Sequence, residues 1–216
     1  MLRRRISLTL PAAAALVAVP LLTGCGNEAR PGAAAVVGDE RITVAQVQAR
    51  AELVREAQEA APHGEHLVRQ SGWLNRAALD SLVRYRVIER VADQVGVDVT
   101  RREVQEYRRE AEHEARGAER LRQLLLQQRS LAPEQIDQDL RMQLLVEKIA
   151  DRSGADLRTP QGQQKVRALL QKASKELRVR VNPRFGTWDH AKVGLGDHKD
   201  PWLRDDPEGQ GQRLAA

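Results

Sequence analysis

The stretch 74-LNRAALDSLVRYRVIERVADQVG-96 decides the fold predicted for this chain. Its apolar residues recur at steps of three and four positions, which predicts an α-helix. They are Ala78, Leu82, Tyr85, Ile88 and Ala92, with Leu79, Val83, Val87 and Val91 widening the same stripe. A helix that is apolar over so much of its surface should lie at the centre of the fold. Gly96 is expected to end it, because glycine readily adopts the left-handed conformation found after many helices.

Helical patterns continue on both sides of this central helix. Thr43 with Gln46, and Thr100 with Glu103, form capping-box patterns, in which each side chain can satisfy a free backbone N–H at a helix start. The expected helices cover about residues 44–60, 74–95, 100–126, 133–149 and 159–173. The chain is therefore predicted to be mainly α, with a core built from Leu, Val, Ile and Ala.

Two short strand patterns flank the helices. Residues Ala34–Val37 are apolar, and Leu177–Val181 alternates apolar residues with arginines, a period of two that predicts a strand. A lone strand leaves backbone groups unpaired. We therefore expect the N-terminal and C-terminal strands to pair in a small two-stranded sheet. A turn should follow over residues 182–186, and residues 190–216, with few apolar positions, are expected to form a disordered tail.

The single cysteine, Cys25, ends the sequence Leu22-Thr23-Gly24-Cys25, after arginines at positions 3–5 and an apolar stretch at 8–22. This order is typical of a lipoprotein signal, in which a peptidase cuts before a cysteine that already carries a diacylglycerol. A transmembrane helix is disfavoured, because Pro11 and Pro20 interrupt the stretch and a span needs about 20 residues. We expect residues 1–24 to be a signal peptide, Cys25 to be lipidated and residues 25–33 to be a tether. The protein would then lie at the extracytoplasmic face of the cell membrane.

The charge pattern argues against nucleic-acid binding. The chain has 35 Lys and Arg against 30 Asp and Glu, a formal net charge of +5. Removal of residues 1–24 would take away three arginines and no acid, so the net charge would fall to +2. The remaining charges of both signs are interspersed, as on solvated helix surfaces, and form no basic stripe.

Three motifs stand out along the chain: 35-AVVGDERIT-43, then 96-GVDVT-100 followed by 103-EV-104, and finally 179-VRVNPRFG-186. With the Cys25 signal, they resemble the SurA/PrsA-type extracytoplasmic chaperones. The resemblance covers roughly residues 34–189, and 181-VNPRFGTWD-189 is its most specific part. It implies a helical SurA N-terminal-like domain that binds and shields unfolded, newly exported polypeptides without ATP.

The chain departs from many members of that family in one respect. They carry a parvulin-type prolyl isomerase domain before the closing helix and strand, where this chain has only the nine residues Asp151–Thr159. An independent domain needs about 50 residues or more. Isomerase activity is therefore not expected, and no phosphate-binding loop of the Gly-x-x-x-x-Gly-Lys-Ser/Thr type supports ATP use. We expect no cofactor.

Other catalytic or metal-binding patterns are weak. His63 and His66 flank a Gly-Glu pair without a third ligand nearby, whereas zinc sites use three or four. The tail residues His190, Asp197, His198 and Asp200 are loosely spaced. The serines lack a Gly-x-Ser-x-Gly elbow, and Cys25 is assigned to lipid. The sequence thus predicts neither a metal site nor an enzyme.

The best candidates for client binding lie on the predicted helix 100–126. They are Tyr107, Leu121, Leu124 and Leu125. For Leu82, Ile88 and Leu144 a role in the core is favoured instead. The expected partners are unfolded exported polypeptides and the membrane, and the oligomeric state stays open. An alternative function is that of a non-catalytic adaptor that binds one dedicated envelope partner.

Overall fold

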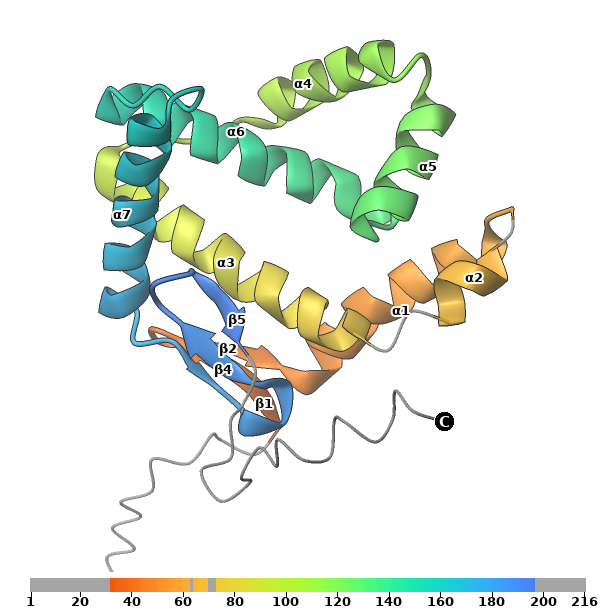
Figure 1. The fold of residues 1–216 in the computed structure, drawn as a ribbon, viewed down its shortest axis with the longest axis horizontal. Coiled ribbons are helices and arrows are strands. Elements are labelled where there is room, and N and C mark those ends of the chain that lie inside the picture. The colour runs from red at the N-terminus through yellow and green to blue at the C-terminus, as the bar shows by residue number, and fades with distance from the viewer. Residues whose placement is uncertain (1–31, 63, 70–72, 197–216) are drawn as a thin grey trace, which may run out of the picture.

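The central position predicted for residues 74–95 is confirmed in the computed structural model, which describes residues 32–62, 64–69 and 73–196. Helix α3 (Leu74–Val95) runs through the middle of the fold (Figure 1). Leu79, Val83 and Val87 are completely buried. Gly96 ends the helix with a φ of 69°. The apolar stripe therefore forms the core around which the other helices pack.

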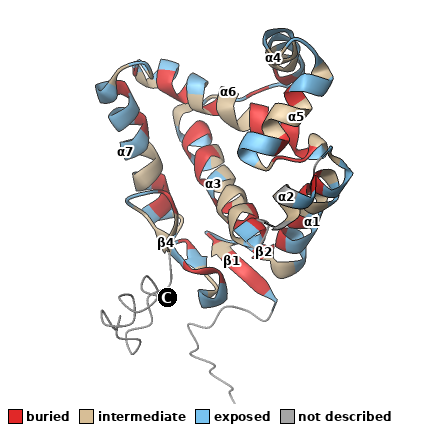
Figure 2. Cartoon of the chain, turned by 45° about the vertical axis from the view of Figure 1, so that its right-hand side comes forward, coloured by how far each residue is buried: buried red, intermediate tan, exposed pale blue. Residues whose placement is uncertain are grey.

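The remaining helices surround α3 as a mainly α-helical fold. They are α1 (Val44–Ala60), α2 (Gly64–Arg69), α4 (Arg101–Glu114), α5 (Ala118–Arg129), α6 (Ile136–Ser153) and α7 (Pro160–Glu176). Both predicted capping boxes are present: the Thr43 hydroxyl accepts the Gln46 N–H, and the Thr100 hydroxyl accepts the Glu103 N–H. Buried residues line the sides of α1, α6 and α7 that face α3, while most of α4 is exposed (Figure 2).

The predicted pairing of the two ends of the domain is confirmed, although the sheet has three strands instead of two. Strand β1 (Ala33–Val37) lies between β2 (Glu40–Thr43) and β3 (Arg180–Val181), and both pairings are antiparallel. The third strand forms because Gly38, with a φ of 59°, lets the chain turn back directly onto β1. Leu177 caps α7, so β3 is shorter than the predicted strand.

The long helix predicted over residues 100–126 is wrong, because two helices are formed there. Arg116 and Gly117, with φ values of 63° and 133°, separate α4 from α5. A positive φ stops helical hydrogen bonding, and the Gly117 N–H instead closes the end of α4 by donating to the Glu112 carbonyl. As a result, α4 and α5 form an arch over α6 (Figure 1).

The prediction of a disordered tail over residues 190–216 is also wrong for the first residues of that range, because residues 194–196 form a strand. Strand β4 (Thr187–Asp189) pairs antiparallel with β5 (Gly194–Gly196) in a separate two-stranded sheet. Val193 is buried, and the Leu195 N–H donates to the Asp80 carboxylate of α3 at 2.7 Å. These contacts to α3 keep the hairpin in place. The signal segment, Cys25 and residues 197–216 lie outside the described residues.

Candidate functional site

An exposed tryptophan marks the strongest candidate for a binding surface. Trp73 immediately precedes α3 and is 48% exposed, and it is the single large apolar side chain that is exposed in the described part of the chain. Two hollows open beside it and share Trp73, Ala77, Asp80 and Arg84. We call these four residues the Trp73 surface.

The inner hollow has a volume of about 190 Å³ and lies between α1, α3 and the connection from α5 to α6. Much of its wall is apolar, with contributions from Ala51, Val54, Leu74 and Leu131, all of them buried. Arg50, Arg129 and Asp139 supply charges at the same wall. The hollow thus combines apolar side chains with several charged and polar groups, which can bury and orient a small group.

Two arginines hold very different partners in the inner hollow. Arg129 makes a bidentate ion pair with the buried Asp139 carboxylate, at 2.9 and 3.0 Å. Arg50 is half-buried, and within the described part of the chain its guanidinium donates only to neutral groups: Gln138 Oε1 at 2.6 Å and Ser81 Oγ at 3.4 Å. Burial lowers the pKa of Arg50, against an opposing effect of the nearby Asp139 charge.

The outer hollow, of about 400 Å³, lies between α3 and the β4–β5 hairpin. Asp80 joins its two sides, because its carboxylate accepts hydrogen bonds from Arg84 at 2.7 Å and from the Leu195 N–H at 2.7 Å. Arg76 donates to the Gly196 carbonyl at 3.1 Å. The hairpin at the C-terminal end of the described chain therefore forms one wall of this hollow.

The four client-binding residues predicted from the sequence lie elsewhere, on α4 and α5. Tyr107 donates a hydrogen bond to Glu147 of α6 at 3.0 Å, and burial together with this carboxylate raises the pKa of Tyr107 to about 12. Leu121 is buried, and Leu124 and Leu125 are half-buried. None of the four lines either hollow at Trp73. They stay candidates for a second contact surface on the arch.

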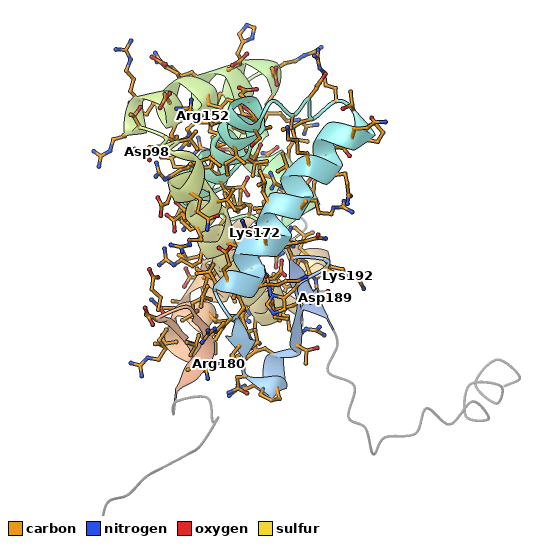
Figure 3. The ribbon with its side chains drawn as sticks, turned by 90° about the vertical axis from the view of Figure 1, so that its left-hand side faces the viewer. Asp98, Arg152, Lys172, Arg180, Asp189 and Lys192 are labelled. Atoms are coloured by element: carbon orange, nitrogen blue, oxygen red, sulfur yellow. The ribbon has the colours of Figure 1, made fainter. Side chains whose placement is uncertain are left out.

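A third cleft, of about 1270 Å³, is polar. It extends from the β1–β2 turn along α3 to the loop before α4. Its lining includes Arg180 and Asp98, which are labelled near the bottom and near the top of Figure 3. Many of its charges already have partners, such as Arg86 with Glu40 and Glu89, both at 2.8 Å. Such a surface offers little apolar area for an unfolded chain.

The histidines that the sequence singled out form no metal cluster in the parts of the chain that are described. No group of three or more His, Cys, Asp or Glu side chains there could hold an ion. His63, His198 and the Asp residues of the tail lie outside the described residues. His190 Nδ1 lies 2.7 Å from Ser174 Oγ, but Ser174 is completely buried and its hydroxyl also accepts the Trp188 indole N–H. This serine has a structural role.

Sequence reasoning missed Trp73 and Arg50. Trp73 stands just before the apolar stripe of α3 and outside its period, in a chain with few aromatic residues. Arg50 lies on the same face of α1 as the buried Val47, Ala51 and Val54, at helical spacing. A charge on an apolar helix face is the signal that could have identified it.

Comparison with known proteins supports the resemblance found in the sequence. A family model described as the SurA-like N-terminal domain matches residues 1–150, well over half of the chain. No curated protein and no solved structure shows significant similarity to it. No helix within residues 32–62, 64–69 and 73–196 is long and apolar enough to span a membrane. The matched domain is the non-catalytic chaperone part of its family. The chain therefore belongs to the SurA-like N-terminal domain family.

Proposed function

We propose that this protein is a membrane-anchored, ATP-independent chaperone that holds unfolded polypeptides after export. The observation that carries the proposal is the family match over residues 1–150. The Trp73 surface supports it, because an exposed tryptophan beside hollows with partly apolar walls can bury parts of many different sequences.

The size of the contribution from Trp73 follows from its exposure. A tryptophan can bury about 200 Å², and Trp73 leaves about half of its surface exposed. Covering about 100 Å² of apolar surface contributes about 2.5 kcal/mol at 25 cal/mol per Å². Such a contact favours weak, reversible binding, which suits a chaperone that releases clients without ATP.

Anchoring through Cys25 is the second part of the proposal. The motif Leu22-Thr23-Gly24-Cys25 supports it, and seven residues separate Cys25 from β1. The eight Cα–Cα steps from Cys25 to Ala33 span at most about 29 Å. A lipid on Cys25 would keep the domain close to the membrane and raise its local concentration where exported chains emerge. Cys25→Ala should then release the protein from membranes and leave client binding in solution unchanged.

The chaperone activity can be tested with the chain from residue 26 onward. At near-stoichiometric ratios it should slow the aggregation of several unrelated denatured proteins, as measured by light scattering. Trp73→Ala should raise the amount needed for half suppression several-fold, whereas Trp73→Phe should have a smaller effect. Leu124→Ala tests the arch separately. Absence of suppression across all clients would contradict the proposal.

A dedicated adaptor is the second candidate, and the polar cleft favours it. Its paired charges, such as Arg86 with Glu40, suit recognition of one complementary partner better than recognition of many unfolded chains. Affinity purification from detergent extracts separates the two functions. An adaptor should retain one dominant envelope protein, and a chaperone should retain many exported polypeptides.

A further inference from the structure

We propose that the inner hollow beside Trp73 binds a carboxylate group of a bound polypeptide, with Arg50 as the residue that receives it. The inference rests on the proposed function, since it names the chemistry by which this chaperone would hold one part of its client. It follows from the charges at the hollow, from the burial of Arg50 and from the size of the space.

The charges at the hollow do not balance. Three arginines line it, against two carboxylates. Arg84 pairs with Asp80 at 2.7 Å, and Arg129 pairs with Asp139 in bidentate geometry. Gln143 also donates to Asp139, at 2.6 Å. Both carboxylates are thus already held by other cations.

Arg50 is the arginine of this hollow that has no ion-pair partner among the described residues. Among the described residues its guanidinium donates to the neutral Gln138 and Ser81, and Asp139, the acid whose charge acts on Arg50, is already paired with Arg129. A half-buried cation without an ion-pair partner costs free energy, and a carboxylate that enters the hollow would remove this cost. A guanidinium has five N–H donors in a planar fork that matches a carboxylate, so donors remain for a ligand.

The dimensions restrict what can enter. A volume of about 190 Å³, with Ala51, Val54 and Ala78 on the apolar walls, suits a single short side chain or a chain end. Trp73 lies at the same hollow and can cover the adjoining part of the polypeptide. The carboxylate can come from an aspartate or glutamate side chain, or from the C-terminus of the client.

The inference can be tested by calorimetry with four peptides that share one apolar sequence. The protein is the chain from residue 25 onward with Cys25→Ser, which retains every described residue. One peptide has a free C-terminus and one is amidated. The other two are amidated and carry either Glu or Gln at a single internal position. The free acid, the Glu peptide or both should bind about tenfold more tightly than the neutral counterpart. The pair of peptides that shows the preference identifies whether the carboxylate is the C-terminus or an acidic side chain.

Substitutions assign the preference to Arg50. Arg50→Gln should abolish it, and Arg50→Lys should keep part of it. Arg55→Gln is the matched control, because Arg55 lies on the same helix, pairs with Glu52 and does not line the hollow. Thermal unfolding checks that each variant is folded, and the peptide comparison on the parent chain does not depend on any variant.

Three results would overturn the inference: equal binding of acidic and neutral peptides, no measurable binding of any of them, or a preference that survives in Arg50→Gln. Equal binding combined with intact suppression of aggregation would leave the proposed function standing. Loss of both peptide binding and suppression would refute the function as well.

Discussion

Replacement of Ser174 by alanine should loosen the junction between α7 and the last strands. Ser174 is completely buried, and its Oγ accepts the Trp188 indole N–H at 2.7 Å. A second hydrogen bond joins the same oxygen to His190 Nδ1, also at 2.7 Å. The Ser174 hydroxyl of α7 therefore forms hydrogen bonds both with β4 and with the turn that follows it.

The expected loss is about 2 kcal/mol in the free energy of unfolding. Alanine would leave an indole N–H and an imidazole nitrogen without their partner, and an unsatisfied buried group costs about 1–3 kcal/mol. Trp188 and His190 are only half-buried, so water recovers part of the cost. Alanine also favours a helix by about 0.5 kcal/mol over serine. For a chain of this length, the melting temperature should fall by about 4–8 °C.

Ser153→Ala is the matched control, because Ser153 also lies in the last turn of a helix. Its hydroxyl donates to the Ile149 carbonyl of the same helix, α6, and its loss leaves no donor stranded. The control should change stability by less than about 0.5 kcal/mol. Urea and thermal unfolding followed by circular dichroism give both values. Trypsin cleavage after Arg184 and Lys192 should accelerate only in Ser174→Ala.

A double-mutant cycle with Trp188→Phe isolates the hydrogen bond. If the Ser174 hydroxyl acts through the indole N–H, the two substitutions should cost less together than the sum of their separate effects. Equal stability of Ser174→Ala and Ser153→Ala, or strict additivity with Trp188→Phe, would refute this account of the junction.

Three further predictions concern other parts of the fold. Leu79→Ala should lower the free energy of unfolding by about 3 kcal/mol, measured in urea, because Leu79 is completely buried in α3. Gly186→Ala should lower the free energy of unfolding by about 2 kcal/mol and expose the β4–β5 hairpin to trypsin. The φ of Gly186 is 116°, and an added Cβ would lie 2.3 Å from the Gly196 carbonyl oxygen. Hydrogen bonds from Lys148 and from the Thr100 cap lower the pKa of Glu103 to about 2. The Glu103 carboxylate therefore contributes its full stabilisation above its ordinary pKa of 4.5, and this contribution is lost as the pH falls towards 2. Lys148→Met should raise that pKa, as followed by carbon-13 NMR of the carboxyl group.

Local signals in the sequence predict much of the fold correctly. The apolar period places α3 at the centre, and the two Thr-x-x-Gln/Glu pairs mark the starts of α1 and α4. The pairing of β1 with β3 follows from the need of each strand for a hydrogen-bonded neighbour. Each of these predictions depends on residues close together in the chain or on a requirement that every fold must meet.

Long-range partners explain what the sequence does not predict. Val193 and Leu195 look like isolated apolar residues in a polar tail, but Asp80, far away in the chain, accepts the Leu195 N–H and helps to order the hairpin. Arg116 adopts a positive φ, which its residue type does not suggest. The hollow at Trp73 is assembled from α1, α3 and the connection from α5 to α6, so no single stretch of sequence contains its pattern.

A chain of contacts connects the Trp73 surface to the start of the fold. Leu195 lines the outer hollow beside Trp73, and β5 ends at Gly196, whose carbonyl lies next to Gly186. The turn before Gly186 contains Asn182, whose backbone N–H donates to the Ala34 carbonyl and whose side-chain amide donates to the Ala33 carbonyl of β1. If Cys25 carries a lipid, as proposed, the tether of at most about 29 Å enters the fold at the strand to which these contacts lead from the surface proposed to hold clients. An exported chain would then meet that surface near the membrane, and the anchor would compensate for the weak affinity of a shallow contact.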